Sequence, residues 1–116
     1  MKQREYTDYL HDILDAMEKA VAFSRDLSEK EFLSDEKTVY ATVRALEIIG
    51  EAAKQIPKHL KQRYPDIPWR EMMAVRDKVI HAYFGVDGSV IWTTVHKDIP
   101  PVIPLIRHII REIEGT

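Results

Sequence analysis

The sequence predicts an all-α protein, an up-and-down bundle of four to five helices. Apolar residues recur at spacings of three and four, no long alternating strand pattern is present, and only 4 of the 116 residues are Gly. A chain of this length has room for one hydrophobic core. Residues 1–116 are therefore expected to form a single helical domain.

The first predicted helix runs from about Thr7 to about Phe23. Thr7 or Asp8 is expected to cap its start, and a polar connector with a short turn around Glu29–Leu33 follows it. Its apolar residues have the spacing of one helix face. They are Leu10, Ile13, Leu14, Met17 and Val21.

The second predicted helix is the longest, from about Asp35 to about Ile56, with Ser34 or Asp35 as its N-cap. It is apolar on more than one side, which predicts a position in the middle of the bundle or at an interface. Gly50 costs a helix about 1 kcal/mol relative to Ala, so we expect it to serve a close approach of two helices. A short helical turn is predicted at Lys58–Arg63.

The third predicted helix runs from about Pro68 to about Phe84, and a fourth segment runs from about Ser89 to about Ile113. A proline-rich stretch at 100–104 should kink or restart the fourth segment, with Asp98 as the N-cap of its second piece. The core side of the third helix is predicted to carry Trp69, Met72, Met73, Val75, Val79 and Ile80.

Composition and charge exclude several classes of protein. Without cysteine, the chain has no disulfide, thiolate zinc site or Cys nucleophile. No apolar run approaches the length of a membrane span, and the first residues are polar, so we expect a cytoplasmic protein without a signal peptide. The net charge of −2 does not suit a general polyanion binder. Residues 51–80 hold 7 Lys/Arg and 4 Asp/Glu, a local +3 that suits phosphate contact or simply a solvated helix face.

Residues 76–83 read R-D-K-V-I-H-A-Y and contain a candidate active site. Arg76 suits phosphate contact, and His81 belongs to the residue type that most often transfers protons in catalysis. Together they are a minimal set of groups for cutting RNA without a metal. Asp77 precedes His81 by four residues and is expected to orient the imidazole. An Arg and a His near one helix end are, however, often ordinary surface groups, and five helical residues turn them about 140° apart.

A polar stripe on the second helix is a second candidate. Arg44, Glu47 and Glu51 recur at helical spacing and can pair on one face. Such a stripe is commonly a solvated ladder of ion pairs, each worth roughly 0.3–0.5 kcal/mol. The functional alternative is a polar strip that lines a cleft beside a catalytic group. Because no two histidines are four residues apart and no other ligand cluster is present, no metal or other cofactor is expected.

The chain resembles the HEPN-domain family, and within it the HepT-like toxins. R-D-K-V-I-H-A-Y matches the R-x4-H-x-Y motif of that family. The run R-A-L-E-I-I-G-E-A at 44–52, F-G-V-D at 84–87, Trp92 and D-I-P at 98–100 are also similar. The resemblance covers most of the chain in order.

This resemblance implies a dimerising helical bundle in which the R-x4-H motifs of both protomers meet in one cleft. It also implies a metal-independent endoribonuclease toxin with Arg76 and His81 as the catalytic pair, supported by Arg44, Glu47 and Glu51 of the second helix. The implied partners are a second copy of the chain, an RNA substrate and a nucleotidyltransferase antitoxin of the MntA type. The antitoxin would transfer AMP to the tyrosine of the motif, which is Tyr83 here.

Two alternatives remain open on the sequence. A non-catalytic HEPN module would dock a nucleotidyltransferase, or a nucleotide-bearing partner, without cutting RNA. A purely structural helical dimer would use Arg44, Glu47 and Glu51 only to set its register. Tyr83 could likewise only pack its ring at the helix end and leave its hydroxyl in water.

Overall fold

The structure is a computed structural model that describes residues 4–85 and 88–115, with the side chains of 82–85 outside the description. The described residues form helices and no strand, as the sequence predicts. The elements are α1 (Tyr6–Ser24), α2 (Glu29–Ser34), α3 (Glu36–Lys54), α4 (Lys58–Arg63), α5 (Trp69–Gly85), α6 (Ser89–Thr93), the π-helical turn η1 (Thr94–Asp98) and α7 (Ile103–Glu114).

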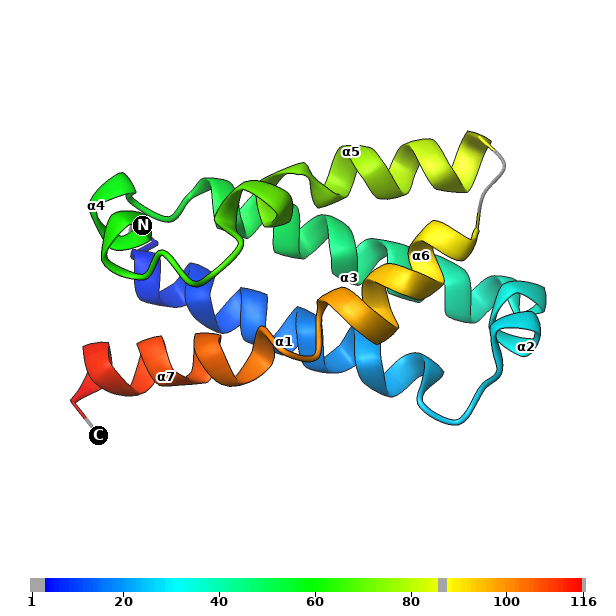
Figure 1. Cartoon of the computed structure of the whole chain (residues 1–116), viewed down its shortest axis with the longest axis horizontal. Coiled ribbons are helices and arrows are strands. Elements are labelled where there is room, and N and C mark those ends of the chain that lie inside the picture. Colours follow the sequence, from blue (N-terminus) through cyan, green and yellow to red (C-terminus); the bar gives the residue numbers. More distant parts are fainter. Residues whose placement is uncertain (1–3, 86–87, 116) are drawn as a thin grey trace.

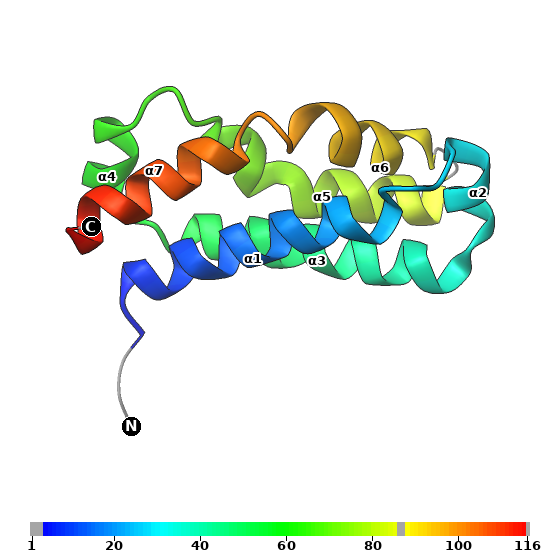
Figure 2. The ribbon, with the colours of Figure 1, turned by 90° about the horizontal axis from the view of Figure 1, so that it is seen from below.

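The three longest helices, α1, α3 and α5, run side by side along the long axis of the molecule (Figures 1 and 2). α3 packs against both α1 and α5, so the predicted central position of the second helix is confirmed. α7 packs along α1, and α6 with η1 crosses between α5 and α1. One cluster of buried apolar side chains joins these elements into a core.

Local capping chemistry sets two of the helix starts. Asp35 accepts a hydrogen bond from the backbone N–H of Thr38 at 3.3 Å, which confirms Asp35 as the cap of α3. α1 begins at Tyr6, one residue earlier than predicted. Its cap is Glu5, which forms a capping box with Asp8, so the predicted cap was wrong.

The predicted cap at Asp98 was also wrong. Asp98 ends η1, and its carboxylate lies 3.8 Å from the ammonium group of Lys78 on α5. α6 continues into η1 without a break, so helical backbone runs through Asp98 instead of starting there. α7 begins only at Ile103, with Pro104 in its first turn, and the predicted interruption by prolines is confirmed.

The core side of α5 is mostly as predicted. Met73 and Ile80 are only partly buried, because both turn toward the outer edge of the helix. They leave some apolar surface exposed on that side. The buried side chains of α5 include Trp69, Met72, Val75 and Val79.

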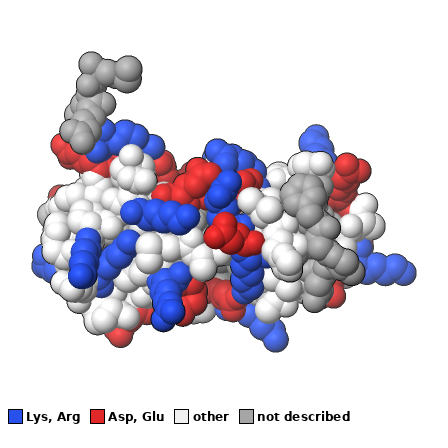
Figure 3. All heavy atoms as spheres, turned by 90° about the horizontal axis from the view of Figure 1, so that it is seen from above, with Lys and Arg blue, Asp and Glu red and all other residues white. Residues whose placement is uncertain are grey.

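The surface on the α5 side carries both signs of charge. Figure 3 shows Lys and Arg side chains gathered toward the α4 end and mixed with Asp and Glu elsewhere. Lys61 and Arg63 in the last turn of α4 belong to the segment 51–80, whose local excess of basic residues the sequence indicates. Within the described ranges, no helix has both the length and the apolar character needed to cross a membrane.

Candidate active site

Arg76 lies on α5 directly against Gly50 of α3. A Cβ atom placed on Gly50 would lie 3.2 Å from the Cβ of Arg76 and 3.3 Å from its backbone nitrogen. These distances are shorter than ordinary van der Waals contact, so the two helices can meet this closely only where one of them lacks a side chain. The expectation that Gly50 serves a close helix approach is confirmed.

Three carboxylates surround the guanidinium of Arg76 without hydrogen-bonding to it. Its Nε lies 3.8 Å from Oε2 of Glu47 and 3.9 Å from Oε1 of Glu51, and its Nη1 lies 3.9 Å from Oδ1 of Asp77. Nε is buried and has no hydrogen-bond partner within the described part of the chain. Because these distances exceed hydrogen-bond length, the guanidinium keeps donors that another anion can use. The Arg76 side chain is 42% exposed, so such an anion can reach it.

Arg44 extends this arrangement along α3. Its Nη1 lies 3.6 Å from Oε1 of Glu51, the same oxygen that faces Arg76. Glu51 therefore lies between two guanidinium groups, and the predicted pairing on the polar stripe is confirmed for Arg44 and Glu51. We call Arg44, Glu47, Glu51, Arg76 and Asp77 the Arg76 cluster.

A groove between α1 and α3 adjoins the Arg76 cluster. It has a volume of about 440 Å³, and Arg44 and Glu51 form part of its wall. Opposite them, Arg4 pairs with Asp12 at 2.8 Å and lies 4.7 Å over the ring of Tyr9. The hydrogen bond that Arg4 donates to Asp12 raises the pKa of Arg4. Sequence reasoning missed this wall, because no spacing along the chain relates residues about forty positions apart.

His81 lies on α5 on a different side of the helix from Arg76. Its imidazole is exposed, and five residues of helix turn it about 140° from Arg76. The two side chains therefore leave the helix in different directions. Asp77 shares a helix face with His81, yet its carboxylate contacts Arg76 in this structure. The role of Asp77 in orienting His81 stays a prediction.

Tyr83 lies in the last turn of α5, seven residues after Arg76. Its side chain is outside the described residues, so its surroundings stay a prediction. On a regular helix, seven residues place two side chains within about 20° of each other and two turns apart along the axis. A shared side of α5 for Tyr83 and Arg76 therefore stays a prediction from the helix period.

The histidines of the chain are dispersed. His11 bonds to Glu114 at 3.1 Å, and His96 bonds to Ser24 at 3.1 Å. Across residues 4–85 and 88–115, no three His, Cys, Asp or Glu side chains are grouped so that they could hold a metal ion.

The chain is similar to proteins of one ribonuclease family. A family model described as ribonuclease HepT-like matches residues 13–109. A Thermococcus cleftensis protein named probable ribonuclease HepT is 55% identical over 98 residues, which cover 84% of this chain and 89% of that protein. A predicted RNase of Methanocaldococcus jannaschii is 42% identical over 99% of this chain and 95% of its own length. A predicted RNase of Caldanaerobacter subterraneus is 38% identical over 90% of this chain and 93% of its own length. No solved structure matches the chain significantly.

Proposed function

Because the chain belongs to the HepT-like ribonuclease family, we propose that it is a metal-independent endoribonuclease with Arg76 and His81 as its catalytic residues. The observation that carries the proposal is the state of the Arg76 guanidinium. The Arg76 side chain is 42% exposed, and the carboxylates around its guanidinium lie at 3.8–3.9 Å, beyond hydrogen-bond length. A guanidinium in this state can offer paired N–H donors to a phosphate.

The proposed reaction uses the 2′-hydroxyl of RNA as its nucleophile. His81 takes the proton of this hydroxyl, the 2′-oxygen bonds to phosphorus, and the bond from phosphorus to the 5′-oxygen breaks. A general acid protonates the departing 5′-oxygen, which leaves a 2′,3′-cyclic phosphate and a 5′-hydroxyl. Arg76 stabilises the negative charge that develops on the phosphoryl oxygens. Because the nucleophile belongs to the substrate, the reaction needs no metal-bound water.

A homodimer with a composite site is part of the proposal. Arg76 and His81 point about 140° apart on one helix, so a second copy of α5 is needed to bring both kinds of group to one phosphate. With two copies, one His81 acts as the base and the other as the acid. Met73 and Ile80 lie on α5 between the directions of Arg76 and His81 and are partly exposed. They offer apolar contact area to the second copy.

The proposed cellular role is the toxin of a type II-like toxin–antitoxin pair. A nucleotidyltransferase antitoxin of the MntA type would hold ATP beside Tyr83. The phenolic oxygen attacks the α-phosphorus, its proton passes to a base on the transferase, and pyrophosphate leaves. The resulting AMP group adds a negative charge on the Arg76 side of α5. It would block an RNA phosphate both by occupying its place and by charge repulsion.

The experiment that tests the nuclease proposal is cleavage of a defined RNA by the purified protein in EDTA. The wild type should leave 2′,3′-cyclic phosphate or 3′-phosphate ends, and an RNA with 2′-deoxyribose at the cut position should stay intact. His81→Ala should lose about 10²–10⁴-fold in rate. His108→Ala is the matched control, because His108 is also exposed but lies on α7. If His81→Ala cuts as fast as the wild type, the catalytic assignment is wrong.

The regulatory proposal has a separate test. The intact mass of the protein is measured after incubation with a MntA-type nucleotidyltransferase and ATP. Mass increases in steps of one AMP are expected for the wild type and should be absent in Tyr83→Phe. A wild-type protein that binds the transferase but never cuts RNA would instead be the non-catalytic binding module.

A further inference from the structure

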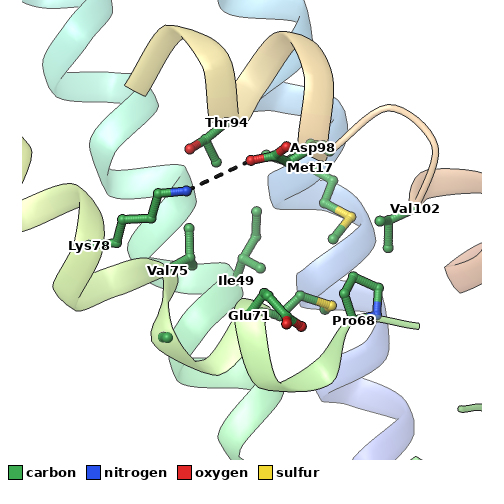
Figure 4. Close-up of a pocket in the computed structure, with 12 residues that line it drawn as sticks. Met17, Ile49, Pro68, Glu71, Val75, Lys78, Thr94, Asp98 and Val102 are labelled. Carbon is green, nitrogen blue, oxygen red and sulfur yellow. Dashed lines mark ion pairs between the residues drawn. The ribbon is translucent and has the colours of Figure 1, made fainter. Parts of the chain in front are cut away.

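A second, apolar cavity lies between α5 and η1 (Figure 4). Its volume is about 190 Å³. The side chain of Lys78, at its edge, points about 160° away from that of Arg76, so the cavity is separate from the Arg76 cluster. The apolar lining side chains, each at most 7% exposed, include Met17, Ile49, Met72, Val75, Ile99 and Val102.

Opposite charges face each other at the edge of this cavity. Lys78 reaches from α5 toward Asp98 on η1, and its Nζ lies 3.8 Å from Oδ2 of Asp98 (Figure 4). Because 3.8 Å exceeds hydrogen-bond length, each group keeps hydrogen-bonding capacity that the other does not use. The two side chains are 52% and 57% exposed, so a ligand can reach both from solvent. The cavity therefore presents an ammonium and a carboxylate beside an apolar wall.

We propose that this cavity binds a free α-amino acid with a large apolar side chain. The ligand carboxylate would pair with Lys78 and the ligand ammonium with Asp98, while the side chain would fill the apolar space. A ligand with only one charge would meet a like charge at the other group, so the pair selects a zwitterion.

The size of the cavity agrees with this class of ligand. A cavity of about 150 Å³ lined by Leu, Ile and Phe side chains admits benzene. The 190 Å³ between α5 and η1 is therefore enough for an isobutyl or benzyl group. Glu71, the other acidic residue of the lining, lies two helical turns from Lys78, about 10 Å along the axis. Asp98 is the carboxylate that lies beside Lys78, so it is the partner that we expect for the ligand ammonium.

The test is binding of L-leucine and L-phenylalanine to the whole chain, measured by calorimetry and by thermal unfolding. Saturable one-to-one binding and an unfolding temperature that rises with ligand concentration are expected. Three matched compounds, each lacking one group of L-leucine, measure what that group contributes to binding. 4-Methylpentanoate lacks the ammonium, 3-methylbutylamine lacks the carboxylate, and glycine lacks the apolar side chain. Each should bind at least about ten-fold more weakly, the effect expected from losing a charged hydrogen bond or the buried group.

Substitutions test the two charged groups. Lys78→Met and Asp98→Asn should each weaken L-leucine binding by about ten-fold or more. Both side chains are more than half exposed, so the fold should tolerate these changes. Lys97→Met is the matched control and should bind like the wild type, because Lys97 is exposed on η1 and does not line the cavity. The proposal is overturned if neither amino acid binds, if Lys78→Met binds L-leucine like the wild type, or if 3-methylbutylamine binds as tightly as L-leucine. None of these readouts depends on RNA cleavage.

Discussion

Gly50 on α3 and Arg76 on α5 lie so close together that a Cβ atom at position 50 would be 3.2 Å from the Cβ of Arg76. The backbone nitrogen of Arg76 is almost as near, at 3.3 Å. This close approach sets the position of Arg76 along the axis of α3. It thereby places the guanidinium beside Glu47 and Glu51. Gly50 therefore affects both the packing of the bundle and the geometry of the candidate active site.

Gly50→Ala should destabilise the protein by about 1 kcal/mol and slow RNA cleavage. Ala gains about 1 kcal/mol of helix propensity, whereas overpacking a tight contact costs roughly 1–3 kcal/mol. The overpacking cost should exceed the gain in helix propensity, because the nearest atoms include backbone atoms of α5 that cannot rotate away. Urea unfolding and the cleavage rate measure the two effects. A variant that is more stable than the wild type and cuts RNA normally would show that the helices do not meet so closely.

Arg76→Lys should fold normally and cut RNA on the order of 10²-fold more slowly. Lysine keeps the positive charge but loses the planar pair of donors that binds a phosphoryl group. Stability should change little, because the side chain is 42% exposed and the three nearby carboxylates are not hydrogen-bonded to it. Arg70→Lys on the same helix is the control and should leave the rate unchanged. Equal rates for Arg76→Lys and the wild type would remove Arg76 from the active site.

Glu47→Gln tests how the guanidinium of Arg76 is positioned. Glu47 is the most buried of the three carboxylates around Arg76, with a side chain 22% exposed. Removing its charge frees Arg76 to move, so kcat should fall about ten-fold. KM should stay the same or fall, because one negative charge near the RNA phosphate is lost. Glu36→Gln at the start of α3 is the control. A raised KM with unchanged kcat would contradict a positioning role.

The cap of α3 predicts one pH effect on stability. The hydroxyl and backbone N–H of Thr38 donate to Asp35, and these bonds hold the pKa of Asp35 below its usual value. Since the pKa is lower in the folded state, the bonds stabilise the fold above the unfolded-state pKa of about 4. The contribution is lost as the pH falls through the folded-state pKa.

Asp35→Asn keeps a capping side chain that does not titrate. The urea midpoint of this variant should therefore fall less than that of the wild type between about pH 6 and about pH 3. Asp66→Asn removes an exposed carboxylate from a connector and serves as the control. If Asp35→Asn follows the wild type across this range, the hydrogen bonds at the cap do not carry the effect.

Local chemistry accounts for most of what could be predicted of the fold. The start of α3 at Asp35 and the break before α7 depend on residues within one or two turns. The prediction for Asp98 failed where a local signal competed with packing. Its side chain suits an N-cap, but η1 continues the helical backbone through it and turns its carboxylate toward Lys78, twenty residues earlier. No local pattern contains that pair.

In the candidate site, too, some relations between residues follow from the sequence and others only from the tertiary structure. The helix period alone puts Arg76 and His81 on different faces and Arg44 near Glu51, since these relations follow from turns within one helix. The surroundings of Arg76 depend on two helices, and Glu47 and Glu51 reach it only because α3 and α5 meet at Gly50. A helix forms through hydrogen bonds that span four residues, so nearby residues suffice to predict it. Contacts between helices depend on how side chains of the whole core interlock, and that information appears only when the chain is packed.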